Sequence, residues 1–143
     1  MAMVAGLPKP VEWIGSSKAD LKSFPEAVQD VVGYALYQAQ VGLKHRGVKP
    51  LRGLGSNVLE VVARHDSDAF RAVYTVRFRV AVYVLHAFQK KARRGIATPQ
   101  PEIDLVRRRL RVAEKHYREN YGGGQIDEGR QRENRTGQRQ RIR

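Results

Sequence analysis

The sequence contains 143 residues, the length of one ordinary domain, which argues against a two-domain enzyme. Its 27 lysines and arginines outnumber 14 aspartates and glutamates, and the net charge of +13 indicates a polyanionic partner such as nucleic acid. The sequence has no cysteine, which excludes disulfides, thiolate zinc sites and thiol nucleophiles.

The N-terminal region predicts a short strand and then a helix. Val11–Ile14 is typical of a strand, and Gly15–Ser17 after it favours a turn. Ser23 and Glu26 have the spacing of a capping box at a helix start. Apolar residues then recur at helical intervals, at Val28, Val31, Val32, Ala35, Ala39 and Leu43. We expect an amphipathic helix of about 17 to 20 residues, followed by a glycine-rich basic loop over Lys44–Asn57.

The middle of the chain changes to the two-residue period of β-strands. Val58–His65, Phe70–Phe78 and Ala81–Phe88 are rich in β-branched and aromatic residues, with turns at Asp66–Asp68 and around Arg79. In the second of these strands apolar residues alternate with residues that include Arg71, so we expect one buried and one solvent-facing side, with Arg71 on the latter. The pattern predicts a three-stranded antiparallel meander.

A second helix is predicted after Pro99 and Pro101. Its apolar positions follow a helical rhythm, at Ile103, Val106, Leu110, Ala113 and Tyr117. Gly122–Gly124 ends it, and the arginine-rich remainder has too few apolar residues for a core. The fold class is therefore α+β, a small antiparallel sheet with an N-terminal and a C-terminal helix. We expect a domain over residues 1–121 and a basic, disordered tail over 122–143.

The sequence contains few motifs for targeting, membrane insertion or metal and cofactor binding. The longest apolar run, Val80–Leu85, is too short to span a membrane, and the N-terminus has no secretory-signal pattern. We expect a soluble, cytoplasmic protein without a membrane partner. The four histidines lack metal-ligand spacing, no phosphate-binding lysine loop is present, and Asp66 with Asp68 favours a hairpin turn over a cation site. We expect neither metal nor cofactor.

Basic residues concentrate in the middle of the chain, where residues 44–98 carry twelve basic and three acidic side chains, a net charge of +9. Arg64 and Arg71 are expected opposite each other on one face of the first hairpin, if Asp66–Asp68 forms a symmetrical turn. The two arginines then either share an anion such as phosphate or lie on a solvated edge.

Lys90 and Lys91 end the third strand of the meander and point to opposite faces, so one of them shares the face of Arg71. The register of the second hairpin stays open, and His86 changes sides with it. His86 is either a general acid or base beside the arginines, or, as we prefer, a sheet histidine with a hydrogen-bond partner. Further basic side chains are candidates for RNA binding: Lys44, Arg46, Lys49, Arg52, Arg77, Arg93, Arg94 and Arg108.

Five segments together resemble the phage-derived HigB-like branch of the RelE/ParE toxin superfamily. They are KPLRGLG (Lys49–Gly55), VLEVVAR (Val58–Arg64), FRAVYTV (Phe70–Val76), VLHAFQKK (Val84–Lys91) and TPQPEIDLVRRRL (Thr98–Leu110). The resemblance implies a small α+β toxin with a basic active surface, acting as a metal-independent endoribonuclease on mRNA, often on the ribosome. Family positions match Arg71, Lys90 and Lys91, and a less constant basic position matches Arg64.

The leading hypothesis is a cytoplasmic toxin that cleaves mRNA and is neutralised by an antitoxin, a helix-turn-helix protein encoded nearby. RNA can supply its own 2′-hydroxyl as nucleophile, so the protein needs only to orient the strand, stabilise negative charge and move protons. The expected catalytic residues are Arg64, Arg71, His86, Lys90 and Lys91. The alternatives are a ParE-like inhibitor of DNA gyrase and a nucleic-acid-binding module without enzymatic activity.

Overall fold

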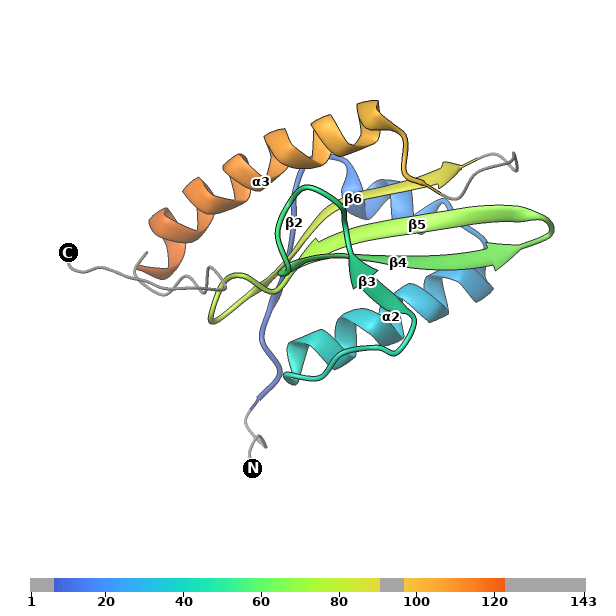
Figure 1. Cartoon of the computed structure of the whole chain (residues 1–143). Helices are drawn as coiled ribbons and strands as arrows, with labels where there is room; N and C mark the ends of the chain where they lie inside the picture. The colour runs from blue at the N-terminus through green and yellow to red at the C-terminus, as the bar shows by residue number, and fades with distance from the viewer. Residues whose placement is uncertain (1–6, 91–96, 123–143) are drawn as a thin grey trace.

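The computed structural model describes residues 7–90 and 97–122. Three helices and five strands follow one another along the chain (Figure 1). They are β2 (Val11–Trp13), α1 (Ser17–Lys22), α2 (Glu26–Gln40), β3 (Val48–Pro50), β4 (Val58–His65), β5 (Asp68–Thr75), β6 (Val82–Lys90) and α3 (Gln100–Tyr121). The α+β class predicted from the sequence is confirmed.

All five strands form one sheet in the order β2-β6-β5-β4-β3. The meander β4-β5-β6 is antiparallel as predicted, and β3 extends it from within the predicted basic loop. The N-terminal strand corrects the expectation of a wholly antiparallel sheet, because β2 pairs with β6 in parallel, Val11 opposite Val82. Two helices and three strands separate β2 from β6 in sequence, a connection long enough for the parallel arrangement.

Helices cover both faces of the sheet, α2 on one side and α3 on the other (Figure 1). The prediction of a solvent-facing side on β5 is therefore wrong: every residue of this strand after Asp68 is buried, Arg71 included. The alternation of β5 marks its two faces correctly. The second face is covered by α3, which is distant in sequence, and strand periodicity carries no information about that contact.

The segment before α2 differs from its predicted form. Residues Ser17–Lys22 form the short helix α1, which the sequence did not predict; Ser17, expected in a turn, is its first residue. Ser23 does not cap α2, because its hydroxyl donates to the Asp20 carbonyl at 2.7 Å, and the N-cap position of α2 is Pro25. The capping-box prediction is thus wrong, and α2 has 15 residues, fewer than expected.

The first hairpin has a turn of two residues, Asp66 and Ser67, both with positive φ (50° and 73°). This turn pairs His65 with Asp68 and places Arg64 opposite Ala69. Arg64 and Arg71 are therefore not directly opposite each other. That pairing would have needed a longer turn. The register differs by two residues, and because side chains alternate along a strand, both arginines still lie on the same face.

Helix α3 follows the predicted pattern closely, since all five of its predicted apolar positions are buried, and Gly122 ends it with a left-handed φ of 78°. Arg109 ties α3 to the sheet by donating to the Leu85 carbonyl at 3.0 Å and to Ser16 Oγ at 3.2 Å. A Cβ on Gly15 would lie 2.8 Å from the Arg109 guanidinium, so this contact requires glycine. The anchored helix holds its first turn over β6.

The predicted tail falls outside this description. The tail predicted to be disordered lies beyond Gly122, outside the described residues, so the division into a domain over 1–121 and a tail stays a prediction.

Within residues 7–90 and 97–122, none of the helices combines the length and the apolar character that crossing a membrane requires.

Candidate functional site

The α3-facing side of the sheet gathers polar residues from four strands. Cross-strand pairing makes three neighbouring rows on this face: Lys49, Glu60, Val73 and His86; then Val62, Arg71 and Phe88; then Arg64, Ala69 and Lys90. Five residues predicted from the sequence as catalytic or RNA-binding therefore share one face, namely Lys49, Arg64, Arg71, His86 and Lys90. We call this set of rows the polar face.

A bulge in β6 decides the position of His86. The pairing of β5 with β6 shifts between Val73 and Tyr74, where β6 contains one additional residue, Leu85. Val84 packs in the apolar cluster on the α2 side, so strict alternation would direct His86 to that side as well. The extra residue returns His86 to the polar face. The register that the sequence left open is thus set, with Lys90 on the face of Arg71.

Glu60 and Arg71 form an ion pair in the interior. Arg71 Nη1 lies 3.2 Å from Glu60 Oε1, and each side chain is 3 % exposed. Thr98, just before α3, donates its hydroxyl to Glu60 Oε2 at 2.5 Å and accepts from Arg71 Nη1 at 3.5 Å. The expectation of a solvent-facing Arg71 is wrong because an internal carboxylate supplies its counter-charge. Arg64, by contrast, is exposed, so neither the shared external anion nor the common solvated edge describes this pair.

His86 is held on two sides. Its Nε2 lies 2.6 Å from Glu102 Oε1 in the first turn of α3, and its ring stacks on Phe88 with centroids 4.7 Å apart. The His86 side chain is 8 % exposed and that of Glu102 33 %. The buried Nδ1 atom has no hydrogen-bond partner among the described residues. The ring is therefore fixed in orientation, with one nitrogen uncommitted.

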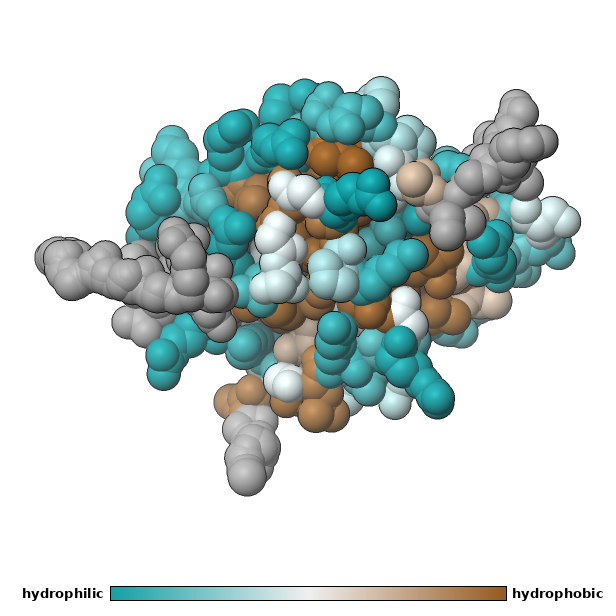
Figure 2. Space-filling view, in the orientation of Figure 1, coloured by the Kyte–Doolittle hydropathy of each residue, from teal (hydrophilic) through white to brown (hydrophobic). Residues whose placement is uncertain are grey.

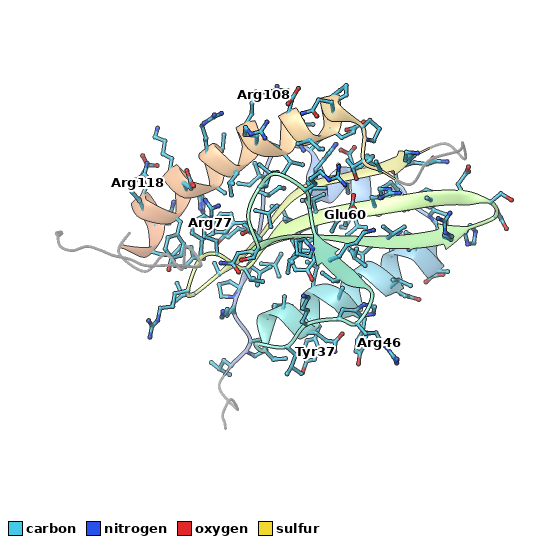
Figure 3. The ribbon with its side chains drawn as sticks, viewed as in Figure 1. Tyr37, Arg46, Glu60, Arg77, Arg108 and Arg118 are labelled. Carbon is cyan, nitrogen blue, oxygen red and sulfur yellow. The ribbon has the colours of Figure 1, made fainter. Side chains whose placement is uncertain are left out.

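The remaining RNA-binding candidates do not gather into one surface. Arg46 lies beside α2 and Arg108 on α3, on opposite sides of the sheet (Figure 3). Arg77 is paired with Glu114 at 2.6 Å. Lys44 and Arg52 are exposed in loops. Two further RNA-binding candidates, Arg93 and Arg94, lie outside the described residues, as does the catalytic candidate Lys91.

Three residues of the site were not identified from the sequence: Glu60, Thr98 and Glu102. For Glu60 a signal was present, because it is the only charged residue between Val58 and Ala63 in an otherwise apolar strand. A lone charge in a buried strand predicts an internal partner. Glu102 follows prolines at a helix start, where acidic residues are common for helix-dipole reasons alone, so its pairing had no distinctive signal.

This arrangement suits chemistry on an anion. A histidine whose ring is fixed by a carboxylate can transfer a proton at its other nitrogen. Arg64 and Lys90 on the same face can attract phosphate groups. Hydrophilic side chains also gather along α3, which borders this face (Figure 2). Among residues 7–90 and 97–122, no group of three or more histidine, aspartate or glutamate side chains is placed to hold a metal ion.

The fold and this site together define a small α+β protein that carries its buried charges on one face of a single sheet. Residues 19–111 match the family described as phage-derived protein Gp49-like (DUF891), and the chain belongs to this family. The membership confirms the phage-derived family recognised from the sequence segments. Among curated proteins, none matches the chain.

Two solved structures are similar in part. A mutant of the E. coli toxin RelE in the free state is 13 % identical, with a TM-score of 0.49, and the match covers 74 % of this chain and 98 % of RelE. The toxin–antitoxin complex RelBE2 from Mycobacterium tuberculosis has a chain that is 21 % identical, with a TM-score of 0.38, covering 59 % of this chain and 93 % of that one.

Proposed function

We propose that this protein is the toxin of a toxin–antitoxin pair and that it is an endoribonuclease that cleaves mRNA, on the ribosome, and so stops translation. Membership of the Gp49-like family and the resemblance of the five sequence segments to HigB-like toxins support the proposal. The observation that carries it is His86, fixed by Glu102 and Phe88 on a face that also bears Arg64 and Lys90. The proposed setting is the cytoplasm.

The hydrogen bond to Glu102 assigns the tautomer of His86. An ionised carboxylate only accepts hydrogen bonds, so Nε2 donates and carries the ring proton. In a neutral ring, Nδ1 then holds a lone pair. Because Nδ1 is buried in the protein without RNA, we infer that RNA binding exposes it, and that Nδ1 then accepts the proton of the RNA 2′-hydroxyl as this oxygen attacks the adjacent phosphorus. The bond from phosphorus to the 5′-oxygen breaks, which leaves a 2′,3′-cyclic phosphate and a 5′-oxygen that takes up a proton from solvent. This reaction uses a nucleophile of the substrate itself and requires no metal.

The cations of the polar face have separate roles in this proposal. Arg64 is exposed and Lys90 partly exposed, so both can approach the phosphate whose negative charge increases during attack. Lys49 extends the same face at β3. Arg71 lies below them and is committed to Glu60, so we assign it to positioning rather than to contact with RNA. Lys91 remains a proposed catalytic residue, and Arg93 and Arg94 remain proposed RNA contacts.

The proposed partners are mRNA, the ribosome and an antitoxin that is a helix-turn-helix protein encoded nearby. An antitoxin that covers the polar face needs acidic side chains, because Arg64, Lys90 and Lys49 together present positive charge there. Covering this face would exclude RNA from His86.

The proposal is tested by replacing His86 with asparagine and measuring mRNA cleavage by purified protein on ribosomes in the presence of a chelator. Loss of a general base typically reduces the rate by about 100- to 10,000-fold. His45→Asn is the matched control, since His45 lies in the loop between α2 and β3, and it should cleave as the wild type does. Circular dichroism verifies that both variants fold.

Other outcomes separate the alternatives. Full cleavage by a folded His86→Asn protein removes His86 from the mechanism. Intact transcripts together with trapped gyrase–DNA complexes in arrested cells identify a gyrase inhibitor. RNA binding with a steep salt dependence and no cleavage identifies a binding module.

A further inference from the structure

A pocket lies at the β2 edge of the sheet, on the side of α2 and therefore on the face opposite His86. Its volume is about 310 Å³, and its walls are formed by Val11 and Trp13 of β2, by α1 and by α2. Small-molecule sites usually measure about 300–1,000 Å³, so this pocket is at the lower limit. It suits one or two amino-acid side chains better than a cofactor.

Gly33 makes the pocket larger at a cost to α2. This glycine is in the interior of the helix, where it is less favourable than alanine by about 1 kcal/mol. A Cβ at position 33 would have no atom within 4 Å, so no contact inside the described chain requires glycine there. The residue lines the pocket, and the space beside its Cα opens into it. An occupant from outside would explain the missing side chain.

The strand beside the pocket has one free side. β2 is the last strand in the sheet order, paired only with β6 among the described strands. The outer edge of such a strand presents backbone donors and acceptors to any extended segment that approaches it. Val11 and Trp13 project from this strand into the pocket, so one extended segment could pair with β2 and also fill the pocket.

The charges at the pocket indicate what kind of peptide segment would bind there. Lys18 and Lys22 of α1 are both exposed at its wall, and the described lining includes no carboxylate. Positive charge without an internal counter-charge favours acidic side chains in an occupant. The other polar lining residues are glutamines, Gln29 and Gln40.

We propose that an extended acidic segment of a partner polypeptide adds to β2 and inserts one large apolar side chain between Trp13 and Gly33. The partner is the antitoxin, and only this identity depends on the proposed function; the binding itself does not. The segment binds on the opposite side of the sheet from His86. One partner could then hold the toxin here and cover the polar face with another part of its chain, which increases its effective concentration at that face.

The single tryptophan of the chain makes binding directly observable, because Trp13 lines the pocket. The probe is a panel of capped eight-residue peptides that alternate glutamate with leucine, valine or phenylalanine, titrated against the full chain while Trp13 fluorescence is recorded. At least one peptide should change the emission saturably. Its counterpart with lysine in place of glutamate should bind more weakly by about tenfold or more, or about 1.4 kcal/mol.

Gly33→Leu adds a side chain whose Cβ has no atom within 4 Å, and it should fill the pocket and weaken peptide binding by at least about tenfold. Ala27→Leu is the matched control, because it adds a leucine side chain at an exposed position of the same helix outside the pocket, and it should bind as the wild type does. Gly33→Ala should raise the melting temperature, because alanine favours the helix, and yet weaken binding.

Several results overturn the proposal. They are the absence of a fluorescence change with every peptide of the panel, equal binding by the lysine peptides, and unchanged binding by Gly33→Leu. Sedimentation that shows dimers of the wild type and monomers of Gly33→Leu assigns the pocket to a second copy of this chain instead. RNA cleavage is measured on the same samples. Absence of cleavage would contradict the proposed nuclease function without affecting the peptide result, and absence of peptide binding would not affect the nuclease proposal.

Discussion

The two faces of the sheet are both covered by a helix, yet they are built from different residues. The cluster beneath α2, which includes Val28 and Val32 of the helix, is apolar except for the hydroxyl of Tyr74 of β5. On the α3 side an apolar cluster of similar size adjoins buried polar side chains: Glu60, Arg71, Thr75 and His86. Apart from the Tyr74 hydroxyl, all buried polar side chains that the described strands contribute thus face α3.

Stability alone does not account for the buried polar residues on the α3 side. The α2 side shows that this chain can cover a sheet face without burying a charged side chain. A buried ion pair such as Glu60–Arg71 adds little net stability, since desolvation of the two charges offsets their attraction. We infer that the role of the ion pair is to position a segment of β6. This segment carries Phe88, which lies opposite Arg71, and His86, which lies two residues away on the same face.

The largest expected effect comes from breaking this pair. Arg71→Ala leaves the Glu60 carboxylate buried without its counter-charge, and we expect a loss of about 3–5 kcal/mol in the free energy of unfolding. Arg64→Ala, on the same face but exposed, should change it by about 0.5 kcal/mol or less. Urea unfolding of both variants provides the comparison.

A double variant sharpens this test. Glu60→Leu combined with Arg71→Met replaces both charges with apolar side chains and should regain most of the lost stability. If the α3 side serves positioning, the double variant folds well and cleaves RNA poorly. An Arg71→Ala protein as stable as Arg64→Ala would show that the two charges are not coupled in the folded protein.

A structural feature could be predicted from the sequence when the residues that determine it lie close together along the chain. The helical rhythm from Ile103 to Tyr117 and the strand period around Tyr74 are local patterns, and both are found as predicted. Burial of Arg71 depends on Glu60 and on Thr98, 27 residues away, and no local pattern contains such contacts. The shared face of Arg64 and Arg71 was predictable because a two-residue register error preserves it.

Two elements of the site lacked a readable signal for different reasons. The bulge at Leu85 reverses the side on which His86 lies, and a run of buried residues on both sides of β6 has no alternation that would reveal it. The tight turn at Asp66 and Ser67 needs positive φ at residues other than glycine, which sequence patterns seldom indicate. Short helices such as α1 are less than two turns long and show no period.

The α2 side should respond to alkaline pH through Tyr74. Burial raises the pKa of Tyr74 from 10.0 to about 12 in the folded protein. Folded Tyr74 therefore stays neutral while the unfolded chain ionises, so its contribution to stability is complete below pH 10 and is lost between pH 10 and about 12. A shift of this size corresponds to roughly 3 kcal/mol. Tyr74→Phe should remove that part of the alkaline destabilisation, which denaturant unfolding just below pH 10 and near pH 12 measures.

The alkaline loss of stability in the wild type has to be compared with that in Tyr74→Phe, because Tyr121 contributes to it in both proteins. The pKa of Tyr121 is likewise raised, to about 12, by its hydrogen bond to Glu12 and by burial. An equal alkaline loss in the wild type and in Tyr74→Phe would show that the Tyr74 ring admits water. The α2 side would then be less closed than its apolar cluster indicates.

The smallest effect compares one buried tyrosine from each face. Tyr83 on the α3 side lies with its hydroxyl 2.6 Å from His116 Nδ1, whereas the Tyr74 hydroxyl on the α2 side has no partner among the described residues. Tyr83→Phe should therefore cost about 0.5–1.5 kcal/mol, the usual value of one hydrogen bond. Tyr74→Phe should be neutral or stabilising at neutral pH, because it removes a buried hydroxyl that forms no hydrogen bond. Thermal unfolding of the two variants side by side tests whether the Tyr83 hydroxyl forms a hydrogen bond that the Tyr74 hydroxyl lacks; equal costs for both would mean that Tyr74 has a partner, such as water, in solution.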